Sequence, residues 1–418
     1  MASSKTDIYV FAHWFGMSTP KLVGILSAHQ AKGRKAFSFE YDRNWLQSKA
    51  QRLLDPDIQF YSGPQYPNHK ENFGIFLDSM PDTWGKTLMK RREIQLAKAE
   101  GRSPRILYEI DYLLGVYDET RMGAFRYKLE MEGDFLDSNS EKSTPPWSSV
   151  AELQQAVFQY ENHPDSDAIN KWLKVLITPG SSLGGARPKA NIIDKNQELW
   201  IAKFPSKNDT IDKAAWEFLT YQLCRKAGIQ MAECKIQKVG KGYHTFFTKR
   251  FDRIYGERIH FSSAMTMTGH SEETLKNQPA SYLDIVEFIQ NHTDNVREQL
   301  HQLWRRIVFN IAVSNTDDHL RNHGFLLQGD SWKLSPAFDL NPSIDKVGLA
   351  LNIDMENNAL DFDLAMSVGE YFRLSQSDMN KILQEVLNAV KQWKEIAQKN
   401  GISRTEQDMM QSAFRCKK

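Results

Sequence analysis

Apolar residues follow a strand-like spacing near the start of the chain and a helical spacing after it. The runs 8–14, 22–28 and 36–41 are rich in β-branched and aromatic residues, which favour short strands of a small sheet or barrel. From about 75 to 117 the spacing becomes helical, with a helix start at 81–82. These patterns predict an N-terminal α/β subdomain.

Strand-like runs also follow the segment 130–150, whose Gly, Ser, Asn and Pro content predicts a linker or long loop. A helical stretch at 147–176 precedes these runs, and a second one at 211–227 lies among them. The runs themselves are 189–194, 198–204, 234–239 and 243–251. This order predicts a mostly β layer that carries one helix.

The rest of the chain, from about 271, is mainly helical in pattern. One stripe of apolar residues repeats at helical spacing and predicts a buried helix face. Its members are Leu300, Leu303, Trp304, Ile307, Val308, Ile311 and Ala312. A second stripe runs from Ile382 to Trp393. A β-rich part followed by a helical part predicts an α+β protein with two lobes.

Composition and charge limit the function classes. The 418 residues carry 53 Lys+Arg and 52 Asp+Glu, a net charge of +1, which excludes a polybasic nucleic-acid binder that depends on bulk charge. No apolar run approaches the roughly 18–20 residues that span a membrane, and the first residues lack a secretory signal pattern. The 3 cysteines fit a reducing compartment. We therefore expect a cytoplasmic protein with no membrane partner.

The segment SNTDDHLRN (314–322) is the most informative for chemistry. Asp317 and Asn322 have the D-x-x-x-x-N spacing of a kinase loop, in which a carboxylate accepts a hydroxyl proton and an amide oxygen binds Mg²⁺. The adjacent Asp318 competes for the role of base, and the spacing to Asn322 favours Asp317. The segment therefore predicts phosphoryl transfer.

Two short strand patterns, 324–328 and 332–338, follow this loop and are joined by a turn. Asp339 closes the second of them. An Asp at this place can bind the metal that bridges the phosphates of ATP.

A second set of candidates precedes the loop. Lys203 shares a strand face with apolar residues, where an unpaired ammonium would be costly. Together with Glu217, on the helix 211–227, it can form the ion pair of a strand lysine and a helix glutamate that holds the ATP phosphates. A structural lysine and a surface glutamate are the alternative.

The run GSSLGGARPK (180–189) comes just before these strands and can cover phosphates. Gly184 and Gly185 permit a close backbone approach, while side chains and exposed amides supply donors. The polar members are Ser181, Ser182 and Arg187. The run matches neither G-x-G-x-x-G nor the Walker A pattern, so a plain β-turn is the alternative.

Taken in order, the motifs resemble the HipA-type toxin kinases of bacterial type II toxin–antitoxin modules. The motifs are SSLGGARPKA, WIAKFPS, KRFDR, NTDDHLRN and LSPAFDLNPS. More loosely, 73–85 and 122–127 look like the N-terminal subdomain of that family. The resemblance spans most of the chain and implies a protein-kinase-like fold. Its expected parts are the subdomain (1–140), a β-rich N-lobe (147–255) and a helical C-lobe (256–418).

The resemblance also implies roles for single residues. Asp317 would be the catalytic base, Asn322 and Asp339 would hold Mg²⁺, and Lys203 would contact the ATP phosphates. Arg321 stands where the family often has Lys and would neutralise phosphate charge.

The KRFDR motif would follow the hinge between the lobes. The backbone of Lys249 and Phe251 would then lie near the adenine, with Asp252 near the ribose. Ser182, beside Ser181, matches the loop serine that such kinases autophosphorylate, which ejects the loop and switches the kinase off.

The implied function is a Ser/Thr protein kinase toxin that uses ATP and Mg²⁺. Its implied substrates are aminoacyl-tRNA synthetases or other components of translation. The implied partner is a helix-turn-helix antitoxin that carries the DNA contacts, so DNA would be bound only indirectly. A small-molecule kinase and a catalytically silent corepressor of an antitoxin–DNA complex are the alternatives.

Overall fold

The computed structural model describes residues 4–31, 34–48, 52–136, 144–163, 169–177, 185–240 and 242–417. Contacts within the chain divide it into two compact units. The first unit contains Met1–Lys207, Asp252–Ser262 and Leu327–Asp330, and the second contains Asn208–Phe251, Ser263–Leu326 and Ser331–Lys418. The expected division at 1–140, 147–255 and 256–418 consists of continuous ranges based on motifs, whereas the two units are discontinuous in sequence. The expected division therefore stays a prediction.

An antiparallel sheet with the strand order β3-β2-β1-β4 opens the first unit. Its strands are β1 (Ser4–Ala12), β2 (Lys21–Ala31), β3 (Arg34–Tyr41) and β4 (Phe125–Lys128). Ile8 and Leu26 lie opposite each other and are fully buried, as expected for the apolar face of a sheet. The Phe76 ring, on α2 (Gly74–Leu77), packs 5.5 Å from that of Phe39. The predicted N-terminal strands are therefore confirmed.

Helices and further strands complete the first unit. The longest helix, α3 (Thr83–Ala99), begins where the Pro-Asp signal predicts, because the Asp82 carboxylate accepts the Gly85 N–H at 2.8 Å. The shorter helical elements are α1 (Arg43–Gln47), α4 (Glu109–Leu114), η1 (Asp118–Thr120), η3 (Trp147–Ser149), α5 (Val150–Asn162) and α6 (Ile169–Ile177). The later strands are β5 (Lys189–Ile193), β6 (Leu199–Lys203), β9 (Arg253–Ile254), β10 (Glu257–Arg258) and β11 (His260–Ser263).

The predicted linker at 130–150 is only partly described, because 137–143 lie outside the described residues. The last part of this segment pairs with the strand β5. The Ile193 N–H, at the end of β5, donates to the Pro145 carbonyl at 2.9 Å. This end of the segment is therefore part of the first unit's structure.

The second unit begins with the helix and strands that the sequence predicts. They are α7 (Lys213–Lys226), β7 (Cys234–Gln237) and β8 (Thr245–Lys249), and the two strands are antiparallel. Phe218 and Tyr221 of α7 pack against a buried cluster that includes Phe246 of β8. The predicted packing of this helix on a β layer is confirmed.

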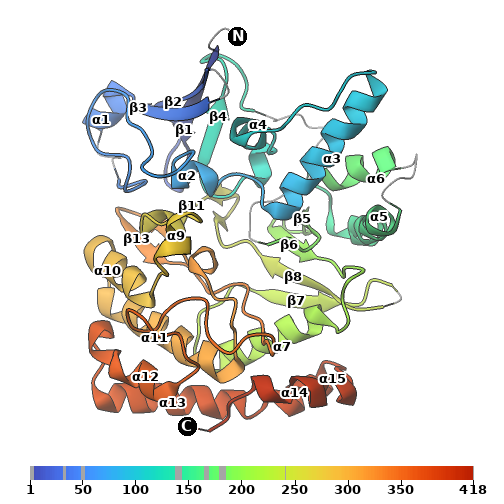
Figure 1. The fold of residues 1–418 in the computed structure, drawn as a ribbon, viewed down its shortest axis with the longest axis vertical. Coiled ribbons are helices and arrows are strands. Elements are labelled where there is room, and N and C mark those ends of the chain that lie inside the picture. The colour runs from blue at the N-terminus through green and yellow to red at the C-terminus, as the bar shows by residue number, and fades with distance from the viewer. Residues whose placement is uncertain are drawn as a thin grey trace. The chain divides into compact units, whose positions relative to one another are not determined.

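The helix α11 (Val296–Val313) is the core of the second unit (Figure 1). The predicted stripe is confirmed, since Leu300, Leu303 and Trp304 are fully buried. The elements packed around it are α10 (Tyr282–His292), α12 (Phe362–Ser367), η5 (Gly369–Phe372) and α13 (Gln376–Val390). The remaining elements are α8 (Ala264–Met267), α9 (Thr274–Asn277), η4 (Leu320–Asn322), β12 (Gly324–Gln328), β13 (Ser331–Leu334), α14 (Trp393–Lys399), α15 (Arg404–Met410) and η6 (Gln411–Ala413).

The second predicted stripe needs one correction. Helix α13 ends at Val390, and Trp393 begins α14 instead of continuing the stripe. The Trp393 ring stacks on Phe414 with a centroid distance of 4.3 Å and an interplanar angle of 7°. The helical spacing of the stripe could not indicate that Phe414 would be the stacking partner of Trp393.

None of the helices in the described ranges has both the length and the apolar character needed to cross a membrane.

Candidate active site

The loop 314–322 leaves the buried end of α11 and is fixed by hydrogen bonds to that helix. Ser314 ends the helix in the left-handed conformation, with φ of 50°. The Asn315 side chain then donates to Asn310 Oδ1 at 3.0 Å. Because both asparagines are buried, this contact holds the loop in one position against α11.

The segment that carries Asp339 is joined to the same loop. The Asn341 N–H donates to Asn315 Oδ1 at 3.4 Å, and the Ser343 N–H donates to the Ser314 carbonyl at 3.1 Å. The two segments that the sequence predicts to supply the base and the metal ligands are therefore held side by side within the second unit.

Asp317 and Asn322 meet within the loop. The buried Asn322 donates its Nδ2 to the Asp317 carbonyl oxygen at 2.9 Å. This bond uses the amide nitrogen, and the amide oxygen Oδ1 is the atom of Asn322 that could bind a metal ion. The Asp317 side chain is 74% exposed and its Oδ1 lies 3.3 Å from Lys346 Nζ. The predicted base is thus open to solvent.

Asp318 has the opposite environment. Its side chain is buried, and Oδ2 accepts from the Tyr282 hydroxyl at 2.5 Å and from Asn310 Nδ2 at 2.7 Å. His323 Nε2 lies 2.8 Å from the same oxygen. Burial alone would raise the pKa of Asp318, but His323 and the donated hydrogen bonds hold it below its usual range. Asp318 is therefore a structural carboxylate, which supports the choice of Asp317 as base.

Asp339 has a left-handed backbone, with φ of 57°. Aspartate is among the few residues other than glycine that enter this region readily, because its short side chain bonds locally. Its Oδ1 accepts from Asn341 Nδ2 at 3.3 Å. Asp339 and the Asn322 amide offer the hard oxygen ligands that Mg²⁺ prefers. In the described ranges no group of three or more His, Cys, Asp or Glu is placed to hold a metal, and a site with one carboxylate and one amide would not form such a group.

Arg321 contacts a glutamate in this structure, whereas the expected partner was a phosphate group. Its guanidinium forms an ion pair with Glu272, and both side chains are substantially exposed. This contact does not exclude a later contact with phosphate, because exposed ion pairs are weak. The role of Arg321 stays a prediction.

The candidates for phosphate binding before the loop belong mainly to the first unit. Lys203 is buried at the end of β6, opposite Lys189 of β5. Gly185 has φ of 94°, a conformation that favours glycine, and Arg187 is half-buried. Ser181, Ser182 and Gly184 lie outside the described residues.

Glu217, the expected partner of Lys203, is buried on α7 in the second unit. The expected ion pair would link residues of different units, and it stays a prediction.

The KRFDR motif is divided between the units. Lys249 ends β8, and Phe251 packs against Phe338 at 5.4 Å in the second unit. Asp252, in the first unit, is fully buried. Its Oδ2 accepts from the Gly123 N–H at 2.8 Å and from Arg253 at 2.6 Å. This burial argues for a structural role of Asp252 and against the expected contact with a ribose.

The structure adds residues that the sequence reasoning missed. Tyr282 and His323 hold Asp318 in place, and neither belongs to the predicted site. Lys189 Nζ forms an ion pair with Asp82 at 2.7 Å, with both side chains almost fully buried. The available signals were the lysine that ends SSLGGARPK and the Asp82 helix start, but nothing in the sequence indicated that they meet.

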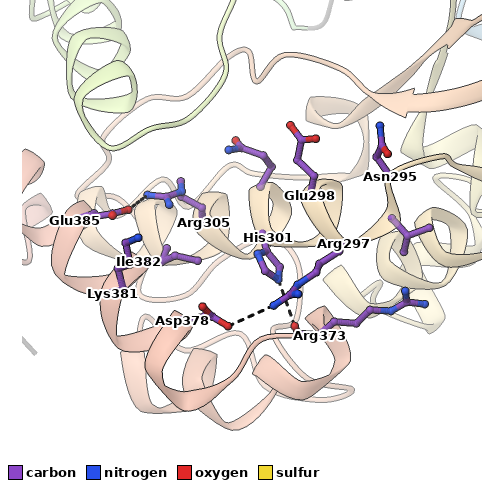
Figure 2. A pocket seen from close by; sticks show the side chains of 12 residues that line it. Asn295, Arg297, Glu298, His301, Arg305, Arg373, Asp378, Lys381, Ile382 and Glu385 are labelled. Carbon is purple, nitrogen blue, oxygen red and sulfur yellow. Dashed lines mark hydrogen bonds and ion pairs between the residues drawn. The ribbon is translucent and has the colours of Figure 1, made fainter.

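A groove of about 740 Å³ lies between α11 and α13 (Figure 2). Ion pairs cross it, from Arg305 to Glu385 at 2.7 Å and from Arg297 to Asp378 at 3.7 Å. None of the described site candidates lines it. The groove is therefore not the predicted active site.

Comparison with known proteins assigns the chain to a family. Residues 181–394, about half of the chain, match the model of the HipA-like C-terminal domain, and the chain belongs to this family. The resemblance to HipA-type proteins expected from the motifs is thereby confirmed.

Structural comparison gives the fold. HipA of Shewanella oneidensis MR-1, solved with HipB and its operator DNA, matches with a TM-score of 0.66 and 17% identity, over 97% of this chain and 94% of that one. At this identity the match shows the fold alone, and it confirms the predicted α+β kinase-like class. The Helicobacter pylori proinflammatory kinase CtkA matches with a TM-score of 0.42 and 16% identity, over 55% of this chain and 87% of that one.

One curated relative also matches in sequence. It is a Haemophilus influenzae protein named "Putative kinase", 27% identical over 179 residues. The match covers 38% of this chain and 52% of that protein. The chain thus aligns with about half the length of this relative.

Proposed function

We propose that this protein is a Ser/Thr protein kinase of a toxin–antitoxin module, which transfers the γ-phosphate of ATP to a hydroxyl of a protein. The observation that carries the proposal is the pair of adjacent aspartates. Asp318 is buried and hydrogen-bonded to three side chains. Asp317 is exposed on the same loop, and its backbone carbonyl accepts a hydrogen bond from the Asn322 side chain. Membership of the HipA-like family supports it.

In this proposal Asp317 acts as the base. Its carboxylate accepts the proton of the acceptor hydroxyl while the hydroxyl oxygen forms a bond to the γ-phosphorus. The bond from that phosphorus to the bridging oxygen breaks, and its electron pair leaves on ADP. The exposure of Asp317 supports this role, because a protein acceptor must reach it.

Asn322 and Asp339 would hold Mg²⁺, through the amide oxygen and the carboxylate. When bound, the ion neutralises charge on the ATP phosphates. The contacts from Asn341 and Ser343 to the loop 314–322 support this assignment, since they hold both ligands in one unit.

The remaining ATP contacts rest on the motifs. Lys203, with Glu217, would hold the phosphates, and the segment around Gly185 and Arg187 would cover them. The backbone of Lys249 and Phe251 would face the adenine. Ser182 is the proposed site of autophosphorylation, by its match to the family.

The substrate and the partner are proposed at the level of class. The acceptor would be an aminoacyl-tRNA synthetase or another component of translation, and a helix-turn-helix antitoxin would neutralise the kinase. The solved HipA relative was crystallised with HipB and operator DNA. That complex supports an antitoxin as partner here, with DNA contacted through it.

The test is incubation of the full chain with labelled ATP, Mg²⁺ and a bacterial lysate. We expect labelled protein bands with the wild type and a loss of about 10²–10⁴-fold with Asp317→Asn, the usual contribution of a general base. The Asp317 side chain is 74% exposed and the substitution leaves the backbone carbonyl in place, so the variant should keep its fold by circular dichroism. Asp408→Asn, at an exposed position of α15, is the matched control and should match the wild type.

Other outcomes decide between the alternatives. Full activity of Asp317→Asn would show that the base is wrongly assigned. Labelled metabolites without labelled protein would favour a small-molecule kinase. ATP binding without any transfer would favour the silent corepressor.

A further inference from the structure

The segment after Asp339 carries an exposed loop, 344–347, that is held at both ends. On one side, the Asp345 N–H donates to Ser343 Oγ at 3.1 Å, and Ser343 is itself bonded to the loop 314–322. On the other side, the Leu349 N–H donates to the Asn358 carbonyl at 2.9 Å, and Asn358 Nδ2 returns a bond to the Leu349 carbonyl at 2.7 Å. The loop therefore has a defined position and keeps its side chains in solvent.

One side chain of this loop reaches the proposed base. Lys346 Nζ lies 3.3 Å from Asp317 Oδ1, an oxygen of the carboxylate that would accept the proton. The lysine and aspartate side chains are 59% and 74% exposed. An ion pair this exposed is weak and screened, so the ammonium can exchange this partner for another anion at little cost.

The transferred phosphoryl group would be such an anion. Its equatorial oxygens spread negative charge beside the base, and an ammonium with three donors can follow them as the bonds change. Arg321, which the motifs suggest for this task, pairs with Glu272 and does not contact Asp317 in this structure, so its predicted role neither requires nor excludes one for Lys346. Among the described residues, Lys346 is the one whose ammonium forms an ion pair with the Asp317 carboxylate.

We propose that Lys346 is a further catalytic residue of the phosphoryl transfer, an inference that rests on the proposed function. In the resting protein its ammonium contacts Asp317. When ATP and the acceptor hydroxyl bind, the ammonium moves from Asp317 to the oxygens of the γ-phosphoryl group. Asp317 is then free to take the hydroxyl proton. Lys346 changes only its hydrogen bonds, and the bonds made and broken are those of the transfer itself.

The experiment compares Lys346→Gln with Lys346→Arg, and with Lys276→Gln as an exposed control lysine of the same unit. At saturating ATP we expect Lys346→Gln to lower kcat by about tenfold or more, below the ~10²–10³-fold that follows loss of a buried oxyanion donor. Lys346→Arg should recover part of the rate, because it keeps the charge. Lys276→Gln should leave kcat unchanged.

Binding gives a readout that does not depend on turnover. Lys346→Gln should weaken the affinity for a non-hydrolysable ATP analogue several-fold and leave the affinity for ADP unchanged, because only the analogue carries the γ-phosphate. A merely structural residue would change both affinities or neither. The thermal midpoint should equal that of the wild type.

Three results would overturn the inference. An unchanged or faster rate for Lys346→Gln would show that the lysine is dispensable or only masks Asp317. A raised KM for the protein acceptor with unchanged analogue affinity would assign Lys346 to acceptor binding. Failure of the proposed function itself looks different, since the wild type would then transfer no phosphate to protein or Asp317→Asn would retain full activity.

Discussion

Replacing Lys189 by Met should destabilise the first unit, because it leaves a buried carboxylate without its partner. The Lys189 ammonium lies 2.7 Å from Asp82 Oδ2, and the two side chains are 1% and 3% exposed. Burial raises the pKa of Asp82, and the lysine opposes that rise. Removing one member of such a pair costs about 3–5 kcal/mol.

The second half of the experiment removes the other charge. Asp82→Asn keeps an oxygen that can accept the Gly85 N–H, the bond that caps α3 at 2.8 Å. Alone it should also cost about 3–5 kcal/mol, because it removes the carboxylate that forms the buried ion pair with the ammonium. The double variant buries no unpaired charge, so we expect it to recover at least about 2 kcal/mol relative to the sum of the single losses.

Urea denaturation followed by circular dichroism measures these free energies. Lys5→Met is the matched control, since Lys5 pairs with Asp7 at 2.9 Å in the same unit but both side chains are exposed. It should change stability by less than about 1 kcal/mol. The reasoning is refuted if Lys189→Met is as mild as this control, or if the double variant loses the full sum of the single losses.

Two further predictions concern other buried groups. Burial raises the pKa of Asp55 to about 6, against the attraction of Lys70. The folded state therefore holds this proton more tightly than the unfolded state, and stability falls by up to about 3 kcal/mol as the pH rises from ~4 to ~6. Asp55→Asn should lack this fall when the free energy of unfolding is compared across pH 4–7, and parallel profiles would contradict the assignment. Tyr282→Phe removes one donor from the buried Asp318 and should cost about 1.5–3 kcal/mol in urea denaturation. Tyr255→Phe, at a 94% exposed position, should be neutral, and an equal loss in both variants would disprove the role of the hydroxyl.

Local patterns predicted most elements of the fold because burial repeats at the period of each element. The stripe from Leu300 to Ala312 identified α11, and the strand runs identified β5 to β8. Trp393 is buried as its stripe predicts, but it begins a new helix, α14, and its packing partner is Phe414. A periodic pattern shows that a face is buried but not what covers it.

The same limit applies to the candidate site. The spacing of Asp317 and Asn322 was readable because their contact is made within one loop. Asp252 looked like a ligand contact, yet it is enclosed by Gly123 and Arg253. Its burial depends on a segment 129 residues away in sequence, which no motif could indicate.

The adjacent aspartates give one loop both a buried residue that fixes its backbone and an exposed carboxylate. Consecutive residues in non-helical backbone can direct their side chains to opposite sides, so Asp318 enters the core while Asp317 faces solvent. A buried carboxylate is costly unless several donors meet it, and Tyr282, Asn310 and His323 do so. These contacts fix the backbone beside Asp317 without placing any partner on its carboxylate. The cation that does reach that carboxylate, Lys346, comes from the exposed loop and can leave it. Asp317, the proposed base, is therefore held firmly through its backbone and loosely through its side chain, which is the combination that the proposed transfer to an acceptor from solution requires.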